Sequence, residues 1–281
     1  MEFVHKLQEL DIQEFSKKIT TSKGVKIKGE RLTFGYVHKA RGTGSQPHRH
    51  PEVEQYNFVL KGQLKPWVDG EERVIGPGES VHIPANTLHS IVAVGDEDCI
   101  FLMVKDTSAN PKQGTSGVPD DPNASAPRKE SEQLESIDKG ADSKYFHKFS
   151  ESEAKLLNPK MTTTKGSRIN GDRITIGLMS HALGTGAQPH RHPDVEQFMY
   201  TISGKCEVNV EGEEKVVGPG DLWHVRPNAL HGNVVVGDED WVFVVAKDVG
   251  VVPGRSIFGV PDDPTVTKPR YAEGYDPDDK K

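Results

Sequence analysis

A repeat with a constant offset of 142 residues runs through the chain of 281 residues. The segment GTGSQPHRHPEVEQ at 42–55 reappears as GTGAQPHRHPDVEQ at 184–197, and GVPDDP at 117–122 reappears at 259–264. Long, varied segments at one offset indicate that a whole domain was duplicated almost without gaps. Each copy has about 140 residues, which is enough for a hydrophobic core of its own.

The repeat predicts an N-terminal domain at 1–125 and a C-terminal domain at 144–281, with a linker at about 123–143. The stretch 107–144 is polar and rich in Pro, Ser and Gly, which is typical of a linker or a loop that follows the surface. The second GVPDDP copy implies that this portion belongs to the domain and wraps its barrel.

Turn residues are frequent, with 28 Gly and 19 Pro, and they separate short candidate strands. Seven or eight short antiparallel strands at this spacing predict an all-β chain with a jelly roll or small barrel in each copy. One short helix is expected before each barrel, near 7–18 and 150–157. The candidate strands of the first copy are 31–38, 54–60, 64–68, 72–75, 80–83, 88–93 and 98–104.

Charge and hydropathy exclude several classes of protein. The net charge is −7 with acidic and basic residues interspersed, so no basic face for nucleic acid is expected. No apolar run reaches the roughly 18 residues that cross a bilayer, and the first residues do not resemble a signal peptide. Cys99 and Cys206 occupy non-equivalent positions in the repeat, which argues against a disulfide framework. These features favour a cytoplasmic protein without membrane or nucleic-acid partners.

Each copy contains a His-x-His pair, a glutamine and a later histidine. Residues two apart on an extended chain point the same way, so both imidazoles of a pair can reach one point inside a barrel. The later histidine follows two turns that contain proline, which is a rigid way to deliver a third imidazole. The spacing therefore brings three imidazoles of each copy toward one point, namely His48, His50 and His89 in the first copy and His190, His192 and His231 in the second, with Gln55 and Gln197 five residues after each pair.

The patterns H-x-H-x4-Q-x6-G at 48–62 and 190–204, and P-G-x10-H at 77–89 and 219–231, resemble the two motifs of the cupin family. The resemblance covers about 100 residues of each copy, so the chain is identified as a bicupin. It implies two tandem jelly-roll barrels, each with one divalent metal ion such as Fe, Mn, Ni or Zn. The resemblance implies two sets of metal ligands: His48, His50, Gln55 and His89, and His190, His192, Gln197 and His231.

The glutamines depart from the family, which has a glutamate at this position. Glu54 and Glu196 lie one residue earlier and are the alternative ligands. The family ligand lies seven residues before the motif glycine, which selects Gln55 and Gln197, and adjacent strand residues face opposite sides. Three imidazoles and an amide are all neutral, so the metal would keep its full charge. Such a metal would be a stronger Lewis acid and would favour anionic chelators.

Two other features are equivalent in both copies. His82 and His224 precede the last histidine of each set and could act as proton shuttles, or could be hydrogen-bonded residues of the pocket wall. Strand alternation places Tyr56 and Phe58 on the outer face of the barrel, with equivalents in the second copy. An aromatic stripe there should be buried against the other domain or in a homodimer.

The resemblance implies a metal-dependent enzyme that acts on a small chelating oxygenated substrate, most often by dioxygenation. The alternatives are redox-neutral isomerase or lyase chemistry on a sugar-derived or keto acid, and a protein that only binds metal or small molecules. GPGDLWHVRPNALH at 218–231 is similar to the second motif of oxalate decarboxylases. However, Ser45 and Ala187 stand where that family has its oxalate-binding arginine. Oxalate decarboxylation is therefore disfavoured.

Overall fold

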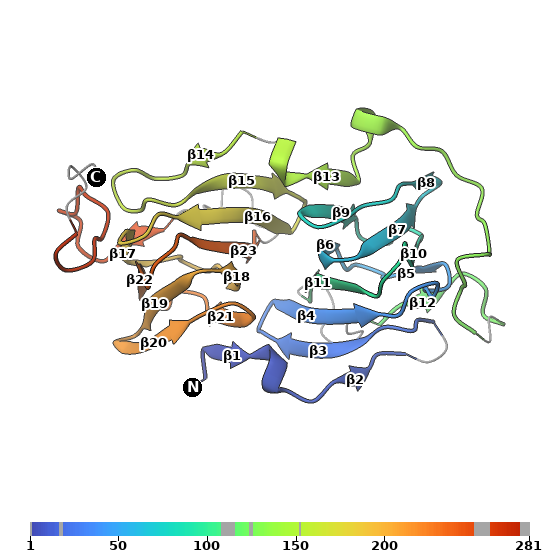
Figure 1. The fold of residues 1–281 in the computed structure, drawn as a ribbon, viewed down its shortest axis with the longest axis horizontal. Helices are drawn as coiled ribbons and strands as arrows, with labels where there is room; N and C mark the ends of the chain where they lie inside the picture. The colour runs from blue at the N-terminus through green and yellow to red at the C-terminus, as the bar shows by residue number, and fades with distance from the viewer. Residues whose placement is uncertain are drawn as a thin grey trace. The chain divides into compact units, whose positions relative to one another are not determined.

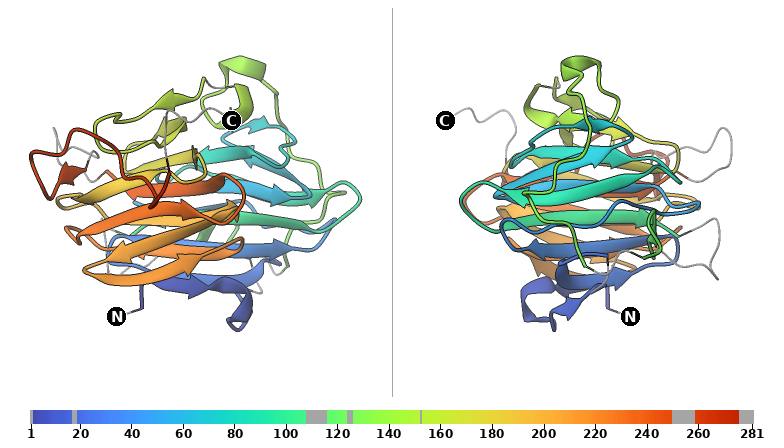
Figure 2. Two further views of the ribbon diagram at one scale, coloured as in Figure 1. Left: turned by 60° about the vertical axis from the view of Figure 1, so that its left-hand side comes forward. Right: turned by 90° about the vertical axis from the view of Figure 1, so that its right-hand side faces the viewer.

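The computed structural model describes residues 2–16, 19–107, 116–123, 126–151, 153–249 and 259–275. Contacts divide the chain into two compact units. The N-terminal unit comprises Leu10–Glu151 and Asn170–Ile174, and the C-terminal unit comprises Met1–Glu9, Ser152–Ile169 and Thr175–Lys281. Strands dominate both units, which confirms the all-β prediction (Figures 1 and 2).

The N-terminal unit consists of a seven-stranded sheet in the order β13-β9-β6-β11-β4-β3-β2 and a five-stranded sheet in the order β12-β5-β10-β7-β8. All of the pairs are antiparallel, and core side chains from both sheets form one hydrophobic cluster. The strands are β2 Gln13–Glu14, β3 Lys23–Lys28, β4 Leu32–Lys39, β5 His48–Arg49, β6 Gln55–Lys61, β7 Gln63–Val68, β8 Glu71–Glu72, β9 Glu79–Ile83, β10 His89–Val94, β11 Cys99–Asp106, β12 Val118–Pro119 and β13 Phe146–Lys148.

The C-terminal unit repeats this topology, with the sheets β1-β21-β18-β23-β16-β15-β14 and β20-β19-β22-β17-β24. Equivalent strands stand in equivalent places, as the duplication predicts. The strands are β1 Val4–Lys6, β14 Lys155–Leu156, β15 Lys165–Asn170, β16 Ile174–His181, β17 Gly186–Arg191, β18 Gln197–Ser203, β19 Lys205–Val210, β20 Glu213–Val217, β21 Asp221–Val225, β22 His231–Val236, β23 Trp241–Asp248 and β24 Val260–Pro261.

The first strand of each repeat copy joins the sheet of the other copy's barrel. β1 pairs with β21, and β13 pairs with β9, as Figure 1 shows. Phe3 and Val4 lie in the hydrophobic core of the C-terminal unit, and Tyr145 and Phe146 lie in that of the N-terminal unit. The sequence division into 1–125 and 144–281 follows the repeat, whereas contacts assign these short segments across it.

The two predicted helices are wrong in extent. The described residues there contain only the 3-10 turns η1 (Leu7–Glu9) and η3 (Phe149–Glu151), followed by β2 and β14. Leu7 is buried in η1, but Leu10 and Ile12 are exposed, so the segment has no continuous apolar stripe that could stabilise a helix. Its backbone instead pairs with a sheet edge, where Gln13 lies opposite Gly24. Across the described residues, helices are all too short to cross a membrane.

The described part of the predicted linker, 126–143, follows the β7–β8 edge of the N-terminal unit. The indole nitrogen of Trp67 donates to the carbonyl of Glu135 at 2.9 Å. Arg128 is 2 % exposed, and its guanidinium donates to Ser90 Oγ at 3.0 Å. This segment is therefore bonded to the barrel surface, and residues 124–125 at its beginning lie outside the described residues.

Candidate metal centres

Residues at or next to the ends of three strands form the N-terminal site. His48 on β5 lies directly opposite His89 on β10, His50 follows β5 in the next turn, and Gln55 begins β6. The ring centroids are 4.2 Å apart for His48 and His89, 4.9 Å for His48 and His50, and 5.1 Å for His50 and His89. All four side chains are buried. The structure thus brings together the residues that the sequence grouped.

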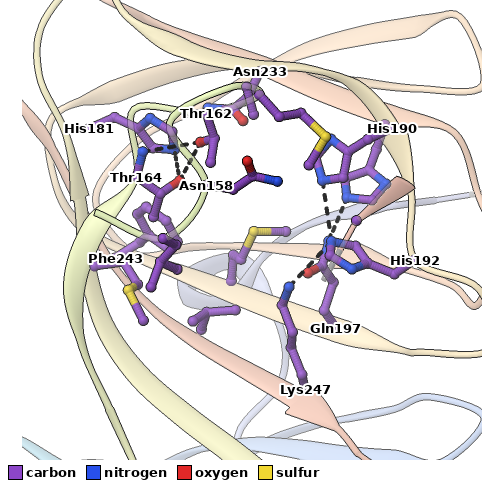
Figure 3. Close-up of a pocket in the computed structure, with 18 of the residues that line it drawn as sticks. Asn158, Thr162, Thr164, His181, His190, His192, Gln197, Asn233, Phe243 and Lys247 are labelled. Atoms are coloured by element: carbon purple, nitrogen blue, oxygen red, sulfur yellow. Dashed lines mark hydrogen bonds between the residues drawn. The ribbon is translucent and has the colours of Figure 1, made fainter. Parts of the chain in front are cut away.

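The C-terminal site has the same arrangement. The ring centroids are 4.2 Å apart for His190 and His231, 4.9 Å for His190 and His192, and 5.2 Å for His192 and His231. In Figure 3, His190, His192 and Gln197 gather on one side of the cavity. In each triad one ring nitrogen per histidine lies within 4.8 Å of the others, so each triad could hold a metal ion.

Backbone carbonyls orient the imidazoles. The Nδ1 atoms of His48 and His89 bond to the carbonyls of Gln46 at 2.7 Å and Thr87 at 2.9 Å. A carbonyl can only accept, so each Nδ1 carries the proton and Nε2 offers its lone pair to the site. His190 and His231 repeat this pattern, bonding to the carbonyls of Gln188 at 2.7 Å and Ala229 at 2.9 Å.

Burial keeps these imidazoles neutral. It lowers the pKa of His48 and of His190 to about 4. It also lowers the pKa of His50, His89 and His231 well below the ordinary value, with positive neighbours adding to the effect. A neutral imidazole is the form that binds metal, so the triads need no proton release at neutral pH.

Unsatisfied polar atoms at the N-terminal site fit a metal ion. The Gln55 amide nitrogen donates to Asn57 Oδ1 at 3.0 Å, whereas Gln55 Oε1 and His89 Nε2 are buried without a hydrogen-bond partner. An oxygen and a nitrogen lone pair left bare in the interior are costly unless a ligand satisfies them. At the other site, Gln197 Nε2 lies 2.7 Å from His231 Nε2, and a half-turn of its amide offers the oxygen instead.

Glu54 lies outside the cavity. Its carboxylate accepts hydrogen bonds from the backbone N–H groups of Asp172 at 2.9 Å, Arg173 at 2.8 Å and Ile174 at 2.7 Å. Gln55, its neighbour on the strand, lines the cavity. Gln197 likewise lines its cavity, whereas Glu196 bonds to His224. That the glutamines are the metal ligands remains our proposal.

His82 and His224 are not among the residues that line the two cavities, and each bonds to a glutamate on the other face of its sheet. His82 Nε2 bonds to Glu54 Oε1 at 2.6 Å, and the ring stacks on Tyr56 at 4.4 Å between centroids. His224 bonds in the same way to Glu196 Oε1 at 2.7 Å. The reason is strand alternation: His82 lies beside Ile83, which pairs with Gln55, and so faces the opposite side. His224 is buried, and His82 is partly buried.

The outward aromatic stripe is buried in the folded chain. Tyr56 and Phe58 are at most 1 % exposed, and the ring of Phe58 lies 5.5 Å from that of Phe149 in η3. Phe198 stacks on His224 at 4.2 Å. Packing of the stripe against the other domain and formation of a homodimer both stay predictions.

Two buried lysines beside the triads were missed by the sequence reasoning. Lys105 on β11 pairs with Gln55, and its Nζ lies 3.0 Å from His50 Nε2. Lys247 on β23 pairs with Gln197, and its Nζ lies 3.2 Å from His192 Nε2 (Figure 3). Burial lowers the pKa of each ammonium group to about 7. The sequence signal that could have identified them is that each lysine interrupts an otherwise apolar strand and that the two are equivalent positions in the repeat.

The two cavities differ in size and lining. The N-terminal cavity has a volume of about 250 Å³, and the C-terminal one about 110 Å³. Trp223 and Trp241 occupy the C-terminal cavity wall at the positions of Val81 and Cys99 in the first copy. Two indoles thus stand where the first copy has two smaller side chains. Both sites therefore keep the triad while the surrounding wall has diverged.

The cupin domain family matches residues 35–105 and again residues 177–247. The chain belongs to the cupin superfamily. It is a tandem cupin, because each match covers the central strands of one unit and includes its histidine triad. Cys99 and Cys206 are both free, buried cysteines.

The tandem cupin is similar to several known proteins over limited segments. It is 42 % identical over 43 residues to quercetin 2,3-dioxygenase of Bacillus subtilis (strain 168), covering 15 % of this chain and 13 % of that protein. It is 32 % identical over 63 residues to the pectin degradation protein KdgF of Dickeya dadantii (strain 3937), covering 22 % of this chain and 57 % of that protein. In both cases the match spans less than two thirds of the relative.

Among solved structures, oxalate decarboxylase of Bacillus subtilis, which has Mn(II) centres, aligns with a TM-score of 0.65 at 17 % identity. The alignment covers 92 % of this chain and 79 % of that chain. At this identity the likeness shows the shared fold alone.

Proposed function

We propose that this tandem cupin is a metal-dependent enzyme that acts on a small oxygenated substrate able to chelate the metal. One observation carries the proposal. In each unit three neutral imidazoles and a neutral amide converge in a buried cavity, and in the described part of the chain no carboxylate lines either cavity. Such a site binds a cation through lone pairs without neutralising its charge. The bound cation can therefore still attract an anionic substrate.

The residues that would hold the metal are the two predicted sets, with the imidazole nitrogens and the glutamine oxygen as donors. A divalent ion bound there would supply strong Lewis acidity toward substrate oxygens, because neutral donors leave its charge intact. Imidazole and amide donors suit Fe, Mn, Ni or Zn.

The chain's own residues would orient and shield the substrate. Lys105 presents its ammonium group beside His50, where it can donate a hydrogen bond to a negatively charged substrate oxygen. Ile91, Phe101 and Met103 also line the N-terminal cavity and exclude water from it. Low local dielectric strengthens the attraction between this ammonium group and an anionic substrate.

Dioxygenation is the reaction that we propose first. The match to quercetin 2,3-dioxygenase supports it, although the match covers only 15 % of this chain. An electron-rich enolate or catecholate held in the cavity would be the species that reacts with O2. The resemblance in fold to oxalate decarboxylase does not argue for that reaction, since Ser45 and Ala187 provide no guanidinium at the oxalate-binding position.

A redox-neutral isomerase or lyase reaction on a sugar-derived or keto acid is the second candidate. It is favoured by the match to the pectin degradation protein KdgF and by the lysine beside each triad, since such reactions need a group that can donate or accept a proton.

The test starts from protein purified without a histidine tag, whose metal content is measured directly. The metal-loaded protein is then offered a panel of catechols, enols, and keto or hydroxy acids with and without O2. Substrate loss coupled to O2 uptake supports dioxygenation, whereas turnover retained under anaerobic conditions supports the second candidate. Failure to bind any divalent metal would contradict both.

A further inference from the structure

We propose that the N-terminal cavity recognises a carboxylate at the far end of its substrate through Lys39, so that this site takes small dicarboxylic hydroxy or keto acids. The inference rests on the proposed function, because the other end of the acid is taken to chelate the metal at the triad. It applies only to the N-terminal unit, because the second copy has His181 at the position of Lys39.

Lys39 is a buried cation in the wall of the cavity. It is the last residue of β4, is 1 % exposed and lines the same cavity as His48 and Gln55. Its ammonium group donates to Thr20 Oγ1 at 3.0 Å. A hydroxyl is a weak partner for a buried charge, and lysines are almost never fully buried without an anionic one.

The charge of Lys39 is not balanced from within the cavity. Among the described residues, its lining includes no Asp or Glu, whereas it includes Lys26, whose Nζ lies 3.7 Å above the ring of Phe15. Burial lowers the pKa of Lys39 to about 7, so an anionic ligand would hold this ammonium group charged. A carboxylate would replace the missing counter-charge and form a charge-assisted hydrogen bond.

Lys39 lines the same cavity as His48, His50 and His89 of the triad. The cavity of about 250 Å³ contains both groups, so one small acid can reach from the triad to Lys39.

Three lysines line the N-terminal cavity, and only Lys39 is replaced in the second copy by a residue other than lysine or arginine. Lys26 corresponds to Arg168, and Lys105 corresponds to Lys247, so these charges are kept. Lys39 corresponds to His181, whose two ring nitrogens bond to Thr163 Oγ1 at 2.9 Å and Thr164 Oγ1 at 2.8 Å.

In Figure 3, His181 lies across the cavity from the triad, beside Thr164. Its ring stacks on Trp241 at 5.8 Å between centroids, and burial lowers its pKa to about 3. A neutral imidazole that is already bonded on both sides has no charge to offer a carboxylate. The C-terminal cavity, which is smaller and lined by indoles, therefore lacks this anchor.

The experiment compares acids that differ only at the far end. One pair is 2-hydroxyglutarate and 2-hydroxypentanoate, and the shorter pair is malate and 2-hydroxybutanoate. Binding is measured by calorimetry on the Zn-loaded full chain that carries His190→Ala and His192→Ala, so that only the N-terminal triad is complete. We expect at least one dicarboxylate to bind more tightly than its partner, by on the order of tenfold to a hundredfold.

The variants Lys39→Met and Lys39→Gln should remove this preference while retaining the affinity for the monocarboxylates. Lys61→Met is the matched control, because Lys61 is exposed and pairs with Glu97 on the surface. The control should keep the preference.

Equal affinities within both pairs, a preference that survives both Lys39 variants, or no binding of any of the four acids would overturn the inference. The proposed function is tested separately by the monocarboxylates, whose binding must depend on the metal. Metal-dependent binding without a preference for dicarboxylates would leave the proposed function standing and remove only the anchor at Lys39.

Discussion

The amide of Gln55 leaves the charge of a bound divalent ion unchanged, whereas a carboxylate would reduce it by one unit. Its oxygen has no hydrogen-bond partner in the structure, and its nitrogen is held by Asn57. The side chain therefore presents an acceptor to the triad without bringing a charge. This feature leaves the full charge of a bound metal ion available to attract an anion.

Replacing Gln55 with Glu should tighten metal binding and weaken the binding of an anionic substrate, because the added charge attracts the cation and repels the anion. We expect turnover at that site to fall roughly 10- to 100-fold while metal occupancy holds or rises. Metal content and kcat/KM are measured together for Gln55→Glu, for Gln197→Glu and for the double variant. Unchanged turnover in all three would show that the neutral donor is incidental.

Lys39 should make the ligand-free protein less stable. Its pKa is about 7 in the fold and about 10.5 when the chain is unfolded. Between these values the unfolded state binds more protons, so the contribution of this residue to stability rises with pH. Lys39→Met should therefore stabilise the metal-free protein by about 1–3 kcal/mol at pH 7 and below, and the gain should shrink toward pH 10. Denaturant unfolding at several pH values checks this. A gain that does not depend on pH would contradict the titration.

Residue spacing was enough to predict the triads, because His-x-His on an extended chain and a later histidine after rigid turns leave few other arrangements. The lysines beside the triads were not predicted. Lys105 reaches the site because it lies opposite Gln55 across a strand pair, and such pairing is not visible in local sequence. The orientation of His82 away from the cavity follows from the strand pairing too, because His82 lies opposite Tyr56.

Among the elements, strands bounded by glycine turns were predicted closely. The expected strand 54–60 corresponds to Gln55–Lys61, and 98–104 corresponds to Cys99–Asp106. The segment Lys23–Lys28 was missed because its lysines and glycine do not form an apolar run, and it becomes a strand by pairing with β4. The predicted helices failed for a similar reason, since tertiary pairing overrode weak local preference.

The exchanged strand β1 should stabilise the sheet that it joins, although it belongs to the first copy of the repeat. The backbone N–H of His224 donates to the carbonyl of Phe3 at 2.8 Å, and that of His82 donates to the carbonyl of Tyr145 at 2.7 Å. Deleting residues 2–9 should speed hydrogen exchange at the amide of His224 by at least about tenfold, because the edge of β21 loses its partner.

The amide of His82 is the internal control for this deletion, since its partner segment remains in place. Exchange rates are read by NMR or by mass spectrometry of peptides from β21 and β9. Equal protection of β21 with and without residues 2–9 would contradict the pairing of β1 with that strand.

At the scale of the whole molecule, duplication kept the ligand geometry and changed the walls. The ring distances in the two triads agree within 0.1 Å, whereas the cavities measure about 250 and 110 Å³. The repeat made the two-domain plan predictable from sequence. The repeat could not show that the first strand of each copy pairs with the barrel of the other copy. The offset between equivalent residues is the same whether or not these strands are exchanged.

Two equivalent triads predict two metal ions per chain, bound at separate sites. His50→Ala and His192→Ala should each reduce the content to one ion, and the double variant should bind none, because two imidazoles and an amide hold a divalent ion poorly. Metal is counted by mass spectrometry after dialysis.

Metal at about a hundredfold above its dissociation constant should stabilise each intact site by about 2.7 kcal/mol, so removing metal with a chelator should lower Tm in the wild type. The chelator should leave Tm of the double variant unchanged. Activity lost in one single variant and kept in the other identifies the catalytic copy, whereas two ions retained in His50→Ala would refute the assignment of the N-terminal ligands.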